Sequence, residues 1–207
     1  MKLSKIILLI LAVLLSFIFV FNQPQMLALP LGLFLYVFRY KIIDAFKNTN
    51  LSLAYILVGW FLGMTIELLA IWQNMSLPFG QRKLFNQDPI LDLMVGAGFY
   101  FVVSIILYLF VQRYKFSKKI FLGITAFYAI VIEQLGVVFF AGLTNPLLWV
   151  YVAIVYGVWT VTPYLLFYDR FSERRSPSFW VYFMLLIVLW VASFIGSVLG
   201  TLLSRMI

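Results

Sequence analysis

The chain has 207 residues, of which 65% are hydrophobic and only 11% are charged. This composition leaves too few polar residues for a soluble domain, so we interpret residues 1–207 as one integral membrane domain. The chain contains no cysteine and no histidine, which excludes disulfide bonds, cysteine nucleophiles, histidine-ligated zinc or haem, and serine–histidine catalysis.

Apolar segments predict an all-α, polytopic bundle of seven transmembrane helices, because a helix that spans a membrane needs about 20 apolar residues. In chain order the predicted helices cover residues 6–22, 24–38, 51–73, 90–111, 120–141, 146–168 and 179–203. The first segment follows two lysines, as a signal peptide does, but it lacks a small-x-small cleavage pattern and is interpreted as a helix. The second is short and contains Pro30 and Gly32, so a tilted or broken helix and a re-entrant hairpin are alternatives to a full span.

The basic residues predict how the bundle is oriented. With seven crossings, twelve of the fifteen basic residues share one side: Lys2, Lys5, Arg39, Lys41, Lys47, Arg113, Lys115, Lys118, Lys119, Arg170, Arg174 and Arg175. Only Arg82, Lys83 and Arg205 fall on the other side. Because basic residues are retained in the cytoplasm, the N-terminus is predicted inside and the C-terminus outside the cell (inner) membrane. The net charge of +8 then belongs to the cytoplasmic rim, where residues 169–175 are expected to form a solvated cluster, and gives no support to a nucleic-acid partner.

Three carboxylic acids are predicted at membrane depth. Glu67 lies about 24 Å and Glu133 about 20 Å from the cytoplasmic boundary of a hydrocarbon layer about 30 Å thick. Asp92 begins its helix from the outer side, and charging any of these groups without a partner is costly. We therefore expect the three acids to share a pocket in the outer third of the membrane. The structural alternative is that each bonds a neighbouring helix, with Asp88-Pro89 capping the helix that places Asp92 in its first turn.

Small and polar residues mark the helix faces that are expected to contact other helices. Three such faces contain an acid, and their residues recur every three or four positions; we call them stripes: Gly59, Gly63 and Glu67; Asp92, Gly96, Tyr100 and Ser104; Ala129, Glu133 and Gly136. A fourth stripe, Ala192, Gly196 and Gly200, predicts close packing of the last helix.

The only long connection on the outer side, residues 74–89, is expected to lie over the acids. Pro78-Phe79-Gly80 predicts a tight turn in it. This segment is interpreted as a lid, or alternatively as a simple turn with an aromatic belt at the lipid headgroups. The aromatic residues expected to bind a substrate are Trp72, Phe79, Tyr100, Tyr156 and Trp159.

Two motifs between residues 67 and 145 resemble membrane proteins of carotenoid biosynthesis. Glu67 followed by Pro78-Phe79-Gly80 resembles the carotenoid hydratases, although the acid stands farther from the turn and bulkier residues replace the usual glycine and threonine. The segment Ile132-Glu133-Gln134-Leu135, followed by Phe139-Phe140 and Thr144-Asn145, resembles the small membrane lycopene cyclases. Gln134 stands where those cyclases have a second acid.

The resemblance implies an enzyme that protonates a double bond of a membrane-dissolved isoprenoid and then hydrates or cyclises it. Glu67 or Glu133 would be the acid, Asp92 its electrostatic partner, and no cofactor or metal would be needed. Aromatic faces would stabilise the carbocation.

Other functions remain open. The same acids could bind the proton or cation of a coupled transporter. Alternatively, the chain could be a non-catalytic subunit among the membrane lipids, whose acids pair with a helix of a partner protein or of a further copy of the chain. Asp88 and Asp92 match half of the magnesium-diphosphate site of membrane prenyltransferases, but the second acidic pair is missing. A retinal photoreceptor is excluded because the last three predicted helices contain no lysine within the membrane.

Overall fold

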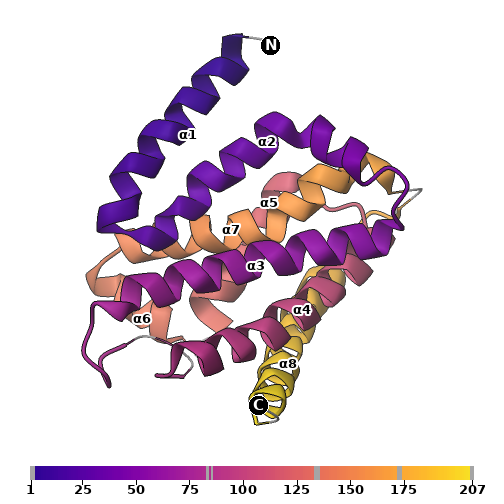
Figure 1. The fold of residues 1–207 in the computed structure, drawn as a ribbon. Coiled ribbons are helices and arrows are strands. Elements are labelled where there is room, and N and C mark those ends of the chain that lie inside the picture. Colours follow the sequence, from indigo (N-terminus) through magenta and orange to yellow (C-terminus); the bar gives the residue numbers. More distant parts are fainter. Residues whose placement is uncertain (1–2, 83, 85, 133–135, 172–173, 206–207) are drawn as a thin grey trace.

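The computed structural model is a bundle of α-helices, shown in Figure 1. It describes residues 3–82, 84, 86–132, 136–171 and 174–205. The elements in chain order are α1 (Leu3–Asn22), η1 (Pro24–Leu27), α2 (Ala28–Ala45), α3 (Leu51–Met75), α4 (Pro89–Arg113), α5 (Lys118–Phe127), η2 (Tyr128–Ile132), α6 (Val137–Thr144), α7 (Leu147–Phe167), η3 (Tyr168–Arg170) and α8 (Phe179–Ser204).

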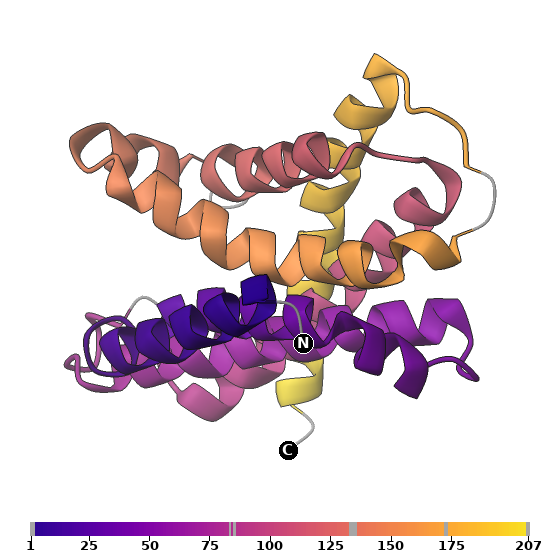
Figure 2. The same ribbon diagram turned by 90° about the horizontal axis from the view of Figure 1, so that it is seen from above.

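Most of the helices form two groups on opposite sides of the molecule, and α8 runs from one group to the other. Figure 2 shows α1, α2 and α3 along one side of the molecule and α5, α6 and α7 along the other, with α8 passing from one side to the other. Contacts of α7 with both α2 and α3 join the two sides. Within the described residues, six helices are long and apolar enough to span a membrane. The predicted all-α transmembrane bundle is therefore confirmed, while the direction in which its two ends face stays a prediction.

The second predicted segment is one continuous helical stretch. It runs for 22 residues from Pro24 to Ala45 and so extends beyond the predicted boundary at residue 38. Pro30 lies in the first turn of α2, where its missing N–H costs no helical hydrogen bond. It therefore does not break the helix.

The prediction of a continuous helix over residues 120–141 is wrong. The stretch Lys118–Ile132 and helix α6 meet at an angle of 92°, and together they count as a seventh candidate span only if the bent pair is taken as one. Gly136 precedes α6 with a φ of +84°, a conformation that glycine adopts at little cost. Glu133, on which one predicted acid and the cyclase-like motif depend, lies outside the described residues, as does Gln134.

Helices α4 and α8 pack with their backbones in direct contact. A Cβ atom placed on Gly98 would lie 2.4 Å from the carbonyl oxygen of Gly196 and 2.6 Å from the backbone nitrogen of Gly200. A Cβ atom on Gly196 would lie 2.7 Å from the Cα atom of Phe99. The packing face predicted for the last helix is thus confirmed, and Gly98 of α4 is its partner.

Arginines tie together one end of the bundle, here called the basic end, which consists of residues 44–50, 111–118, 167–171 and 174–178. Arg170 donates hydrogen bonds to the carbonyl oxygens of Phe46 (2.9 Å) and Thr49 (3.1 Å). Arg174 donates to the carbonyl oxygen of Val111 at 3.3 Å, and its guanidinium lies over the aromatic rings of nearby residues. Both arginines are only partly exposed, so the expected solvated cluster is wrong for them. Isolated positive charges in a sequence do not reveal which carbonyl groups they meet in the fold.

The orientation can be tested with reporters. A reporter fused after Ile207 is expected to lie outside the cytoplasm, and one inserted at Lys118 inside it, because twelve of the fifteen basic residues share the side of Lys118 in the predicted topology. A reporter at Lys47 is the control and should behave like the one at Lys118. If the reporters at positions 118 and 207 lie on the same side, the predicted seven crossings are wrong.

Candidate functional site

Helices α3 and α4 face each other through the two predicted stripes, in steps of four residues. Here each glycine of one helix accommodates a larger side chain of the other. A Cβ atom on Gly59 would lie 2.7 Å from Oγ of Ser104, and one on Gly63 would lie 2.3 Å from the ring of Tyr100. One on Gly96 would lie 2.9 Å from Cγ of Glu67. The predicted contact faces are confirmed, and we call this contact the α3–α4 seam.

The seam buries a hydrogen-bonded pair made of an acid and a phenol. The hydroxyl of Tyr100 donates to Oε2 of Glu67 at 2.7 Å. Glu67 is 4% exposed and Tyr100 is 5% exposed, so water outside the protein does not reach either group freely. Gly63 and Gly96 provide the space, since any side chain at these positions would overlap the pair.

Aromatic rings continue from Tyr100 into α7. The ring of Tyr100 meets that of Trp159 edge to face, with centroids 4.7 Å apart. The ring of Tyr156 also packs against that of Trp159, with centroids 5.6 Å apart. Three of the five predicted aromatic residues therefore form one cluster beside Glu67.

The other two predicted aromatic residues lie elsewhere. Trp72 is half exposed in the last turns of α3. Phe79 is 75% exposed in the connection between α3 and α4, where the guanidinium of Arg82 lies 5.9 Å from its ring. Their positions match an aromatic belt better than a closed pocket.

Asp92 is fully buried in the first turn of α4. Its Oδ1 accepts a hydrogen bond from the backbone N–H of Asn86 at 2.7 Å, whereas Oδ2 has no partner among the described residues. Asp88 caps the helix by accepting from the N–H groups of Ile90 and Leu91, as predicted. Asp92 is one turn before Gly96, which contacts Glu67, so the two acids are neighbours along the seam.

The connection between α3 and α4 is held by its own hydrogen bonds. The predicted turn is present, with Gln81 N–H donating to the Pro78 carbonyl at 3.0 Å and Gly80 at a φ of +89°. Arg82 donates to the carbonyl of Gln87 at 3.2 Å. Because Asn86 also bonds Asp92, the connection is fastened directly over that acid. Among the described residues, acidic side chains do not gather into a group of three that could bind a metal ion.

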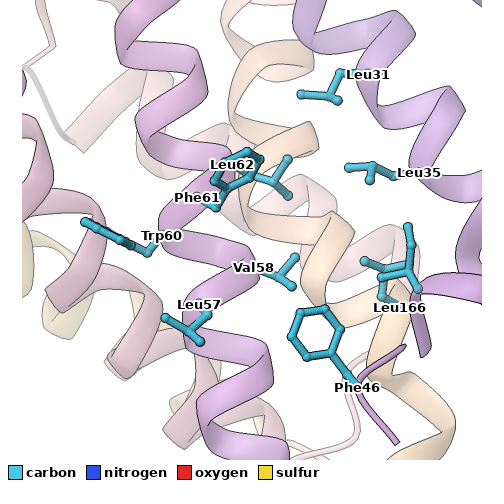
Figure 3. A pocket seen from close by; sticks show the side chains of 10 residues that line it. Leu31, Leu35, Phe46, Leu57, Val58, Trp60, Phe61, Leu62 and Leu166 are labelled. Atoms are coloured by element: carbon cyan, nitrogen blue, oxygen red, sulfur yellow. The ribbon is translucent and has the colours of Figure 1, made fainter. Parts of the chain in front are cut away.

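An apolar cavity of about 370 Å³ lies on a different face of α3, between α2 and α7. Figure 3 shows its lining residues: Leu31, Leu35, Ile42, Phe46, Leu57, Val58, Trp60, Phe61, Leu62 and Leu166. Phe61 is 66% exposed, so the cavity opens toward the surface that faces lipid. Sequence reasoning missed this cavity, because apolar residues that line a cavity look the same in a sequence as those that contact lipid.

Trp60 connects the cavity with the seam. Its side chain points from α3 toward α4 in Figure 3, and its indole N–H donates to the carbonyl of Ala97 at 3.0 Å. Ala97 follows Gly96, the residue that contacts Glu67. Trp60 thus lines the cavity and also bonds α4 next to the residue that contacts Glu67.

Comparison of the chain with models of known protein families, with characterised proteins and with solved structures gave no match. The resemblance of the motifs around Glu67 and Glu133 to carotenoid-biosynthesis proteins therefore stays a prediction.

Proposed function

We propose that this membrane protein is an enzyme that protonates a carbon–carbon double bond of an apolar, membrane-dissolved isoprenoid, with Glu67 as the proton donor. The observation that carries the proposal is the buried Glu67 carboxyl group, which is hydrogen-bonded to Tyr100, whose ring in turn meets that of Trp159. A carboxyl group enclosed by membrane helices favours its neutral form, because charging it there is costly. A neutral acid of this kind can act as a general acid.

Where Tyr100 donates to Glu67, its hydrogen bond leaves the proton of the neutral acid on the other carboxyl oxygen. Tyr100 donates to Oε2, so in the neutral acid the proton is carried by Oε1. In the proposed step this proton forms a C–H bond with one alkene carbon, using the π electrons of the double bond. The other carbon becomes a cation, and Glu67 becomes a carboxylate.

The cation can then be consumed in two ways that return the proton. Addition of water, with loss of one water proton to Glu67, gives net hydration. Attack by a second double bond of the same molecule, followed by loss of a neighbouring C–H proton to Glu67, gives a cyclic isomer. Neither route requires an oxidant or a reductant, and the aromatic cluster of Tyr100, Tyr156 and Trp159 is suited to stabilise the positive charge.

The apolar cavity supports an isoprenoid as the substrate. Its volume of about 370 Å³ is within the range typical of small-molecule sites, and its lining consists of hydrophobic side chains. A chain that enters from the lipid beside Phe61 would contact the cavity lining, of which Trp60 is a part. A change of the Trp60 rotamer, with loss of its bond to Ala97, would then open the way toward Glu67.

The test is to compare the wild-type protein with Glu67→Gln in membranes supplied with linear carotenoid precursors. Gln keeps the size and most hydrogen bonding but cannot release a proton, so formation of hydrated or cyclised product should fall by about 100-fold or more. Asp44→Asn is the matched control, because Asp44 is an exposed acid paired with Lys47 at the basic end, and it should leave the activity unchanged.

Two results would contradict the proposal. One is an unchanged product yield from Glu67→Gln at an equal amount of folded protein. The other is a wild-type protein that alters no isoprenoid, which would favour the transporter or the non-catalytic subunit instead.

A further inference from the structure

Buried polar atoms without a hydrogen-bond partner lie on α3, α4 and the neighbouring helix α7. Among the described residues they are Oη of Tyr55, Oδ2 of Asp92, Oγ of Ser104 and Nε1 of Trp159. Each of these residues is 2% exposed or less. Leaving a buried polar group unpaired costs about 1–3 kcal/mol, so a small hydrogen-bonding occupant would be favoured beside each of them.

Two of these atoms, Oδ2 of Asp92 and Oγ of Ser104, belong to residues on one face of α4. On α4 the residues that face α3 are four apart: Asp92, Gly96, Tyr100, Ser104 and Tyr108. Glu67 occupies the space beside Gly96, and the ring of Tyr55 lies 5.7 Å from that of Tyr108. From Asp92 to Tyr108 the seam is about 24 Å long, which is most of a hydrocarbon layer about 30 Å thick.

The hydroxyl of Ser104 is directed into the seam. Buried hydroxyls elsewhere in the bundle, such as those of Thr125 and Ser193, donate to a carbonyl one turn earlier in their own helix. Ser104 makes no such bond among the described residues, and its Oγ faces Gly59 instead. Pro163 of α7 also lies beside Gly59.

We infer that water molecules occupy the α3–α4 seam and that Asp92 returns protons to Glu67 through them. A buried water needs two to four polar partners, and the seam offers an unpaired oxygen on each side of the Glu67–Tyr100 pair, Oδ2 of Asp92 and Oγ of Ser104. Asp92 is the relay because its Oδ2 is unpaired, it can carry a proton, and it is one turn from the position of Glu67. This inference rests on the proposed function in that the relay restores the acid that the reaction consumes.

The proton arrives from the Asp92 end of the seam. At the opposite end the guanidinium of Arg174 lies 5.7 Å from the ring of Tyr164 and 5.0 Å from that of Phe171, and a fixed positive charge repels protons. The Asp92 end of the seam lies at the start of α4, next to the connection between α3 and α4. The backbone N–H of Asn86 fastens that connection to the relay acid.

The experiment measures proton exchange at Glu67 without any substrate. The infrared band of the protonated Glu67 carboxyl is identified by its loss in Glu67→Gln, and its shift is then followed after transfer from H2O to D2O. Asp92→Asn keeps an acceptor for the N–H of Asn86 but cannot carry a proton, so the exchange should slow by about tenfold or more. Thr125→Val, which removes a buried hydroxyl outside the seam, is the control and should exchange like the wild type.

The outcomes separate this inference from the proposed function. An unchanged exchange rate in Asp92→Asn would overturn the relay while leaving the role of Glu67 intact. Slowing by Ser104→Val but not by Asp92→Asn would also overturn it, because protons would then arrive from the basic end. Absence of a protonated Glu67 band in the wild-type protein would instead contradict the proposed function. Thermal unfolding of each variant shows whether a slower exchange reflects the relay or a damaged fold.

Discussion

Gly98→Leu is expected to prevent α4 and α8 from packing and to lower the free energy of unfolding by at least about 3 kcal/mol. The reason is that the new Cβ atom would meet backbone atoms of Gly196 and Gly200, which cannot move aside as a flexible side chain can. Thermal unfolding in detergent and the amount of protein in the membrane measure the effect.

Gly123→Leu is the matched control for this prediction. Gly123 is also helical, but a Cβ atom there meets no atom within 4 Å, so the same added side chain should be tolerated. Equal losses in the two variants would mean that the added leucine itself, rather than the close approach of α4 and α8, causes the damage.

Gly63→Val should disrupt the acid–phenol pair. Its Cβ atom would lie 2.3 Å from the ring of Tyr100, so the ring must leave its place and the hydrogen bond to Glu67 must break. Overpacking and the loss of a buried hydrogen bond together predict a destabilisation of about 3 kcal/mol. The activity proposed for Glu67 should be lost as well.

A double-mutant cycle shows whether the destabilisation comes from Tyr100. In a Tyr100→Ala background the ring is gone, so Gly63→Val should cost clearly less than it does in the wild type. If the two effects simply add, the valine acts on some other neighbour and the described seam does not explain its cost.

The helix contacts could be predicted from the sequence because small residues recur at helical spacing. The stripes containing Gly59, Gly63 and Glu67 and containing Gly96 and Tyr100 both identified the faces that meet in the structure. Glycine at such a position has few other uses in a membrane helix, so the pattern is specific.

Which residues come together across helices could be predicted only in part. Nothing in the sequence distinguishes Trp159, buried beside Tyr100, from Trp72, half exposed at the end of α3, because both are aromatic residues in apolar segments. The 92° bend before α6 was likewise missed, since an apolar run reads as one span whether or not it turns at Gly136. The cavity beside Trp60 depends on how three helices are spaced, which no single segment encodes.

The arginines of the basic end have two roles, one in membrane orientation and one in contacts between helices. For membrane orientation only their charge counts, and lysine would serve equally well. Arg170, however, donates hydrogen bonds to two carbonyl groups at once. Arg174 combines hydrogen bonds with cation–π contacts to aromatic rings. The point charge of lysine cannot reproduce either arrangement. Exchange between the two basic residues should therefore be free at exposed positions such as Lys41 and Lys119 and restricted at these two arginines. The arginines that are predicted to orient the chain in the membrane thus also hold its helices together.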